Sequence, residues 1–268
     1  MGAIDSAAPC AMLLHVAKVV DEHVQRMYDE MSALGEGGTV EMDMGVQIVF
    51  LDGEEAFVSW SDTDSLYGAR YVHIPLLPPS SQVSIHYRKN GQADVMKSYR
   101  ALAHHWSTTP NPPSSQKFSK YRTPLSQISL FLLLDLLGSP SPSVPSYYAT
   151  THWAYMHLSA IETRMRSLQL LESSPPVPFL NDVNRTVGAY AMISDDHLPF
   201  LAQGTEILHV IPNQFPHGIW HTMQDDGDHL DMPTVRDWAR IVAAFALEWL
   251  DMMEVWDEPG GDKEGVTL

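Results

Sequence analysis

The stretch Val46-Gln47-Ile48-Val49-Phe50-Leu51-Asp52-Gly53-Glu54-Glu55 gives the first indication of the fold class. Its first six residues are apolar apart from one glutamine and rich in β-branched side chains, which is typical of a buried strand. Asp52-Gly53 ends the run, since both residues favour turns. Two adjacent carboxylates, Glu54 and Glu55, are therefore predicted to follow a strand directly.

Two further apolar runs end in a similar way. Residues 128–134 stop at Asp135, and residues 207–211 stop at Pro212. Helical patterns fill about residues 9–34, 151–171 and 232–253. Strands that alternate with helices predict an α/β fold, in which helices cover both faces of a sheet.

The two terminal helices carry the clearest signals. In the first, apolar residues recur at steps of three and four, at positions 13, 16, 20, 24, 27 and 31, which is the spacing of one helix face. In the last, Asp231 is a good N-cap and Pro233 suits the first helical turn. Both segments are therefore expected to be helices, the first of them amphipathic.

Acidic residues gather where the predicted strands end. In an α/β sheet the binding site forms beyond the carboxyl ends of the strands, and Glu54, Glu55, Asp135 and the loop after residue 211 all fall there. One of two adjacent carboxylates can bind a metal ion while the other moves protons. Solvated strand ends and helix caps would give the same pattern, so the residues alone leave both interpretations open.

A second group of candidate residues lies in the stretch 215–223, Phe-Pro-His-Gly-Ile-Trp-His-Thr-Met. Catalytic zinc sites use three protein ligands from His, Asp and Glu and keep a fourth position open. His221 follows Trp220, so it could be a metal ligand beside an aromatic wall. The chain has 13 histidines, and an ordinary loop with incidental aromatic residues is the alternative.

Composition limits the partners of the chain. The 268 residues carry a formal net charge of −17, which argues against nucleic acids and anionic membranes as main partners. No uninterrupted apolar run reaches the roughly 18–20 residues of a membrane span, and the first residues lack the features of a signal peptide. The single cysteine, Cys10, favours an intracellular protein without an internal disulfide, whereas the sequon at Asn184 favours the secretory route.

The segment 71–122 differs from the rest of the chain. It holds seven of the 16 basic residues and a single acidic residue, Asp94. Proline and serine are frequent in it, and Asn90-Gly91 could form the turn of a small hairpin.

Several longer blocks carry more information than any single residue. The most specific are Trp60-Ser61 followed by Asp64-Ser65-Leu66-Tyr67-Gly68, and the stretch 215–223, whereas the Glu54-Glu55 pair is also found in zinc aminopeptidases. The other blocks are residues 2–12, 51–57, 133–140 and 195–200. In their sequence and order, these blocks resemble the glutaminyl-peptide cyclotransferase (glutaminyl cyclase) family.

The resemblance implies a fold and a domain organisation. The fold is that of the zinc exopeptidases (M28-type), a three-layer α/β/α sandwich with a central mixed, mostly parallel sheet. One catalytic domain is expected over residues 1–257, with a flexible tail over 258–268. Residues 72–98 have no counterpart in the family, and a retained intron and a surface hairpin are both open. The family carries upstream strands that are absent here, so we expect an N-terminally truncated chain in which Cys10 lacks its usual partner.

The resemblance also implies the site. One zinc ion, Zn2+, is expected to be held by Asp5, Glu55 and His221. Glu54 is expected to act as the general acid/base, with Asp135 and Asp195 as buried catalytic carboxylates around it. The residues expected at the substrate are Trp60, His209, Phe215 and Trp220, of which the aromatic three form walls and the histidine joins the carboxylate network.

The implied reaction converts the N-terminal glutamine of a peptide or protein into pyroglutamate and releases ammonia. N-terminal glutamate is left open as a second substrate. No nucleic acid and no membrane span are expected, and the resemblance favours the secretory route. Two alternatives stay open: an M28-type zinc aminopeptidase with two metal ions, at the positions of Asp5, Glu55, Asp135 and His221, and an inactive truncated remnant.

Overall fold

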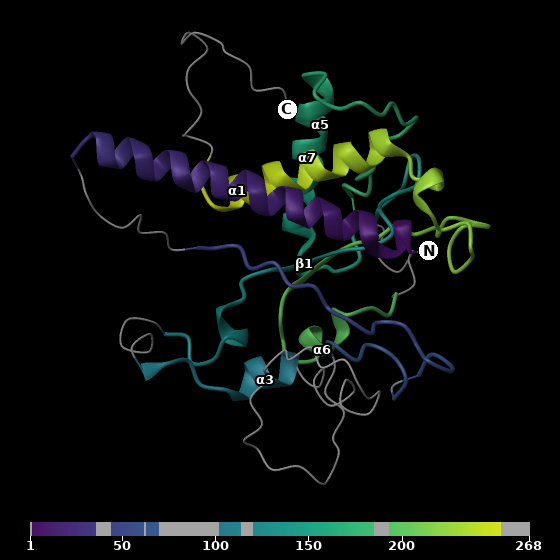
Figure 1. The fold of residues 1–268 in the computed structure, drawn as a ribbon, viewed down its shortest axis with the longest axis horizontal. Helices are drawn as coiled ribbons and strands as arrows, with labels where there is room; N and C mark the ends of the chain where they lie inside the picture. Colours follow the sequence, from purple (N-terminus) through teal and green to yellow (C-terminus); the bar gives the residue numbers. More distant parts are fainter. Residues whose placement is uncertain are drawn as a thin grey trace.

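The structure is a computed structural model that describes residues 2–35, 44–61, 63–69, 102–113, 120–184 and 193–252 (Figure 1). Its elements in chain order are η1 (Ala3–Ala7), α1 (Ala8–Ala33), α3 (Leu102–Thr108), η2 (Leu125–Gln127), β1 (Phe131–Leu134), α5 (His152–Ser167), α6 (Leu198–Leu201), β2 (Ile207–Val210), η3 (Gly227–His229) and α7 (Met232–Trp249). The segment 72–98 and the tail 258–268, both singled out in the sequence, lie outside the described residues.

A parallel pair of strands forms the centre of the described structure. β1 and β2 run side by side in the same direction, with Phe131 opposite Ile207 and Leu134 opposite Val210. Figure 1 shows α1, α5 and α7 on one side of this pair and the short helices α3 and α6 on the other. The prediction of an α/β fold is therefore confirmed.

Alternation along β2 separates the two sides of the sheet. Successive side chains of a strand point to opposite faces. Leu208 and Val210 belong to the main apolar core with the long helices. Ile207 packs in a second core with Phe200 of α6, and His209 bonds Asp195 just before that helix. One histidine thus reaches the functional side because the strand alternates.

The helix pair α1 and α7 supplies about half of the main core. Met12 and Val16 of α1 are buried with Trp238 and Ile241 of α7. Further along, Val20, Val24 and Met27 pack against a smaller cluster around Leu247, at the C-terminal end of α7. The predicted apolar face of the N-terminal helix is therefore the face that α7 covers.

Local signals explain where the helices begin and end. The Asp231 carboxylate accepts a hydrogen bond from the Thr234 backbone amide at 3.1 Å, and a proline follows in the first turn, as predicted. Helix α5 stops at Ser167, before the predicted residue 171, because Gln169 adopts a left-handed backbone with φ 57°. Helix α7 likewise stops at Trp249, ahead of Asp251 with φ 55°.

The predicted strand at residues 46–51 is wrong for the described structure. The segment is not part of any strand pair there. Val46 and Phe50 are exposed, and Leu51 alone packs against the second core. A β-rich apolar run becomes a strand only when a neighbour pairs with its backbone, and the described residues give this run no such neighbour.

The N-terminal helical segment is unusually apolar. Residues 3–33 have a window with mean hydropathy 1.4, and by length and composition they could cross a membrane. The sequence prediction, which considered uninterrupted apolar runs, did not identify this apolar helix. A helix at the core of a folded protein has the same properties, and here α7 covers Met12 and Val16.

A buried carboxylate ties α5 to the segment that follows it. Glu162 is fully buried and accepts hydrogen bonds from the backbone amides of Phe179 (2.8 Å) and Leu180 (2.9 Å). Arg166, one turn later, pairs with the same carboxylate at 2.7 Å. Every oxygen of this charged group therefore has a partner, as burial requires.

We predict that Glu162→Ala lowers the free energy of unfolding by about 3–5 kcal/mol, since it leaves two amides and one guanidinium without their partner. Urea denaturation followed by circular dichroism would measure the loss. The control is Glu172→Ala, because Glu172 pairs with Arg236 and Arg240 at the surface, where ion pairs contribute little. Equal losses in the two variants would contradict the prediction.

Candidate active site

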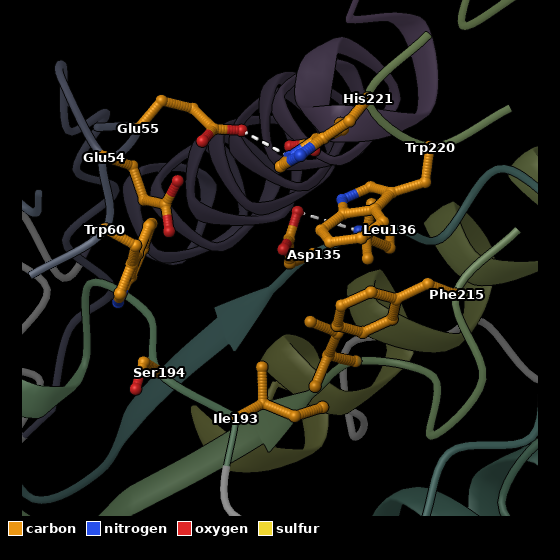
Figure 2. Close-up of a pocket in the computed structure, with 12 residues that line it drawn as sticks. Glu54, Glu55, Trp60, Asp135, Leu136, Ile193, Ser194, Phe215, Trp220 and His221 are labelled. Carbon is orange, nitrogen blue, oxygen red and sulfur yellow. Dashed lines mark hydrogen bonds and ion pairs between the residues drawn. The ribbon is translucent and has the colours of Figure 1, made fainter. Parts of the chain in front are cut away.

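A pocket of about 310 Å³ opens where the strands β1 and β2 end at their carboxyl side. Its ionisable lining residues are Asp5 from η1, Glu54 and Glu55 from one loop, Asp135 after β1, and His221 from another loop. Figure 2 shows Glu54, Glu55, Asp135 and His221 pointing toward one space. The structure therefore brings five of the predicted site residues together.

The loop that carries Glu54 and Glu55 is closed by backbone contacts. The amide of Leu66 donates to the Glu54 carbonyl, and the amide of Tyr67 donates to the Gly53 carbonyl, both at 2.7 Å. A Cβ on Gly68 would lie 2.5 Å from the Asp52 carbonyl oxygen, so only glycine allows this approach. The loop is thus fixed across its base, next to both glutamates.

Asp64 organises the tip of the same loop. Its carboxylate accepts hydrogen bonds from the amides of Phe57, Val58 and Ser59 at 2.8–2.9 Å. The Tyr67 hydroxyl donates to it at 2.6 Å. These hydrogen bonds hold the pKa of Asp64 well below its usual range. The ordered turn leads directly to Trp60, which lines the pocket.

Asp5 is placed by a second aspartate from far along the chain. The Asp225 carboxylate accepts from the amides of Ile4 (2.7 Å) and Asp5 (3.2 Å). Asp225 is buried, and nothing in the sequence marked it. Only its position in three dimensions, beside the N-terminal turn, identifies it as the anchor of a site residue.

Asp5, Glu55 and His221 form a group that could hold a metal ion, since their ligand atoms lie within 4.8 Å of one another. His221 Nε2 is 2.7 Å from Glu55 Oε1 and 3.5 Å from Asp5 Oδ2. The side chains of Glu55 and His221 are about half exposed. One nitrogen and two carboxylates that face an open pocket suit a zinc ion with a free coordination position.

Buried carboxylates surround Glu54. Burial raises the pKa of Glu54 to about 9, and neighbouring acidic side chains, foremost Asp195, add to this. Burial also raises the pKa of Asp135, and the charge of Asp195 again contributes. So many carboxylates cannot all be ionised at close range, and they must share protons or a cation.

Apolar side chains form the walls of the pocket. Trp60 stands on the Glu54 side, and Phe215 and Trp220 stand opposite (Figure 2). The rings of Phe215 and Trp220 lie edge to face at 4.7 Å, and Trp220 stacks on His221 at 3.8 Å. All three predicted wall residues therefore line the pocket, and the stacking restricts the orientation of the metal-ligand candidate His221.

Four lining residues were not singled out in the sequence. These are Leu136, Ile193, Ser194 and Ile211. Leu136 and Ile211 directly follow the residues Asp135 and Val210 at the strand ends, so a stricter use of the strand-end rule would have found them. Ile193 and Ser194 carry no local signal.

Asp195 and His209 lie behind the pocket rather than in its lining. His209 Nε2 is 2.8 Å from Asp195 Oδ2, and both side chains are buried. The predicted substrate residue His209 therefore contacts a carboxylate and not the open space. Glu54 makes no hydrogen bond with Asp135 or Asp195 among the described residues, so their influence on it is through charge.

A second group with metal-binding geometry lies at this buried position. It consists of Asp195, His197 and His209, all buried, with ligand atoms within 4.8 Å of one another. His197 Nε2 already bonds the Tyr148 hydroxyl at 2.5 Å. Burial lowers the pKa of His197 to about 3, so this ring is neutral. The sequence analysis had missed both His197 and Tyr148.

The family model of peptidase family M28 matches residues 1–110 and 113–246 of the chain. The chain belongs to peptidase family M28. The pocket holds the Glu54-Glu55 pair and the loop of His221, and both lie inside the matched residues.

Relatives of this M28 member are named for one activity. The chain is 35% identical over 254 residues to a glutaminyl-peptide cyclotransferase of Boiga dendrophila, covering 94% of this chain and 56% of the relative. It is 33% identical over 252 residues to that of Bos taurus, covering 94% and 57%. The crystal structure of the Macrostomum lignano glutaminyl cyclase superposes with TM-score 0.64 at 28% identity, covering 94% and 63%. The chain thus spans a little more than half the length of these curated relatives.

We predict that Gly68→Ala weakens Zn2+ binding by this M28 member about tenfold or more, because the new Cβ would push on Asp52 and move the two glutamates. Isothermal titration calorimetry with Zn2+ would measure it. Gly45→Ala is the matched control, since a Cβ there meets no atom within 4 Å. An unchanged Zn2+ affinity of the Gly68→Ala variant would contradict the prediction.

Asp196 offers a test of the buried acid cluster. Burial raises its pKa from 3.8 to about 7, with the charge of Asp195 as the next cause. The native state therefore keeps a proton between about pH 4 and pH 7 that the unfolded chain has released, and native stability falls as the pH rises through this window.

We predict that Asp196→Asn unfolds like wild type near pH 4 and is more stable than wild type by about 2–4 kcal/mol at pH 8. Urea denaturation at both pH values would show the divergence. Asp21→Asn on the exposed face of α1 serves as the control and should follow wild type at both. A gap between wild type and Asp196→Asn that narrowed with rising pH would have the wrong sign for the prediction.

Proposed function

We propose that this chain carries the active site of a zinc-dependent glutaminyl-peptide cyclotransferase. The observation that carries the proposal is the half-exposed group of Asp5, Glu55 and His221 at a pocket that also holds Glu54 between aromatic walls. The names of the relatives support it. The substrate would be a peptide or protein with an N-terminal glutamine.

The group of Asp5, Glu55 and His221 suits a catalytic zinc ion better than the buried group of Asp195, His197 and His209. A catalytic ion needs an open position for the substrate, and the first group borders the pocket. In the second group, His209 and Asp195 already bond each other at 2.8 Å. We therefore assign one Zn2+ to Asp5, Glu55 and His221.

The proposed reaction closes a five-membered lactam. The α-amine nitrogen of the substrate forms a bond to its own γ-carboxamide carbon, and the bond from that carbon to the amide nitrogen breaks, so ammonia leaves. When bound, zinc supplies a Lewis acid for the γ-carbonyl oxygen. Glu54 takes the proton from the attacking amine and returns it to the departing nitrogen.

The surroundings of Glu54 suit this exchange of a proton. Among these carboxylates Glu54 has a high proton affinity. The positive charge of a bound zinc ion would lower its pKa, so the carboxylate could lose its proton, accept one from the amine and release it again. The charge of Asp195 favours the protonated form of Glu54, and Asp135 interacts with Glu54 through charge. We assign to these two carboxylates a supporting catalytic role through charge.

The walls provide orientation. A glutaminyl side chain is flexible, and ring closure needs its two ends held close together. Trp60 on one side and Phe215 with Trp220 on the other leave about 310 Å³ between them, which suits one folded side chain. The same walls limit the water that could hydrolyse the amide.

The fold would be the three-layer α/β/α sandwich with a central mixed, mostly parallel sheet, and residues 1–257 would belong to one catalytic domain. Its route would be secretory. The exposed position of Asn184 in the sequon supports this route, because glycosylation needs an accessible asparagine. Nucleic acid is not expected as a partner of so acidic a chain.

An aminopeptidase is the alternative function, because the chain belongs to a family named for peptidases. It would need a second metal ion, with Asp135 as one ligand. Asp135 Oδ1 accepts the amide of Leu136 at 2.9 Å (Figure 2), and Asp135 is not part of either metal-capable group among the described residues. A single ion therefore fits the geometry better.

We predict that the protein releases ammonia from a short peptide that begins with glutamine, and that a zinc chelator abolishes the release. Glu54→Gln should lose at least about a hundredfold in kcat, because it removes the proton carrier, whereas the exposed Glu30→Gln on α1 should match wild type. A coupled ammonia assay would measure all three.

Release of free N-terminal glutamine in place of ammonia, with two bound metal ions per chain by elemental analysis, would establish the aminopeptidase instead. A folded, zinc-loaded protein with neither activity would refute the proposed function.

A further inference from the structure

Two consecutive tyrosines enclose the buried histidines behind the pocket. Tyr147 and Tyr148 lie between β1 and α5. The Tyr147 ring packs on His209 with centroids 5.5 Å apart, and its hydroxyl donates to the Ile211 carbonyl at 3.2 Å. Tyr148 reaches His197 instead, with 2.5 Å between its hydroxyl and Nε2. One tyrosine thus contacts each histidine.

The two histidine rings also pack on each other. Their centroids are 4.3 Å apart, and the His197 side chain is fully buried while that of His209 is almost so. His209 is therefore held between Tyr147 and His197 and can turn only if one of them moves. Its Nε2 meets Asp195 at 2.8 Å, so its orientation decides whether that contact exists.

We propose that Tyr148 is a positioning residue, which acts through His197 to fix the tautomer and the orientation of His209 and thereby the position of the Asp195 carboxylate. Its consequence for the reaction rests on the proposed cyclotransferase function.

Hydrogen bonding argues for one tautomer of His197. Its Nδ1 is buried and has no hydrogen-bond partner in the part of the chain that the structure describes. A buried N–H without an acceptor is more costly than a bare acceptor nitrogen. The proton therefore belongs on Nε2, which donates to the Tyr148 oxygen. Without this oxygen, neither nitrogen of the neutral ring would have a hydrogen-bond partner among the described residues, and packing alone would hold the ring.

The position of Asp195 matters at the pocket. Its other oxygen accepts the amide of Asp196 at 2.6 Å, so the carboxylate is held from two sides, by a backbone amide and by His209. Its charge acts on both Glu54 and Asp135. A displaced His209 would release one side of this carboxylate, and the field at Glu54 would change while the substrate walls stay in place.

The test compares Tyr148→Phe with Tyr155→Phe in the zinc-loaded protein. The Tyr155 hydroxyl is also buried, donating to the Val144 carbonyl at 2.7 Å and accepting the Asp182 amide at 2.9 Å, but it lies outside the pocket lining. It controls for the loss of a buried hydroxyl. Long-range 1H–15N spectra report the tautomer of each histidine ring, with His197→Gln and His209→Gln used to assign the signals.

We expect Tyr148→Phe to shift the ring nitrogen signals of both His197 and His209, and Tyr155→Phe to leave them in place. In the ammonia-release assay, Tyr148→Phe should lose roughly tenfold in kcat with KM within about twofold, and Tyr155→Phe should keep its kcat. His197→Gln should retain more activity than His197→Ala, since a glutamine amide can still reach the Tyr148 oxygen.

Unshifted His209 signals in Tyr148→Phe would overturn the proposal, whether or not the protein is active. So would equal losses of kcat in the two Tyr→Phe variants, which would show a purely structural role. Absence of cyclotransferase activity in wild type would instead refute the proposed function, and the spectra would still decide whether Tyr148 positions His209.

Discussion

The parallel pairing of β1 with β2 is the constraint on which the site depends. Because the two strands run in the same direction, both carboxyl ends fall at one edge. Asp135 leaves one strand there and Ile211 leaves the other. The same register turns His209 to the face opposite the main core. Without this pairing, Asp135 and Ile211, which are 76 positions apart in the sequence, would not share a pocket.

Several carboxyl groups gather around that edge, and the described lining of the pocket contains no lysine or arginine beside them. Glu54, Asp135 and Asp196 all have raised pKa values, and burial is the largest cause for each. The buried carboxylate of Glu162 differs from these groups, because an arginine and two backbone amides are its partners. The contrast separates a carboxylate that stabilises the fold from carboxylates for which we propose cation binding and proton transfer.

Sequence patterns predicted the elements whose signals are local. The apolar face of α1, the N-cap of α7 and the strands β1 and β2 all follow from spacing or capping. The run at residues 46–51 failed because a strand is defined by its neighbour, which composition does not specify. Helix α5 ends before the predicted residue because Gln169 adopts a left-handed backbone. Glycine is the usual sequence signal for such a helix end, and this segment has none.

The site divides in the same way. Glu54, Glu55, Trp60, Asp135 and the loop of Phe215 to His221 were found because they follow strands or match family blocks, and the structure places them at one pocket. Asp225, His197 and Tyr148 were missed because their significance arises from contacts across long stretches of chain.

Asp5 lies near the N-terminal end of a long helix. It lies in η1, three residues before Ala8, the first residue of α1. The 26 residues of α1 make a helix about 39 Å long, and the far half of that helix packs against the end of α7. A rigid helix transmits a small tilt along its whole length. Repacking around Val24, Met27 or Leu247 would therefore act as a lever on the pocket rim, so sequence variation remote from the chemistry could tune it without altering any residue that lines the pocket.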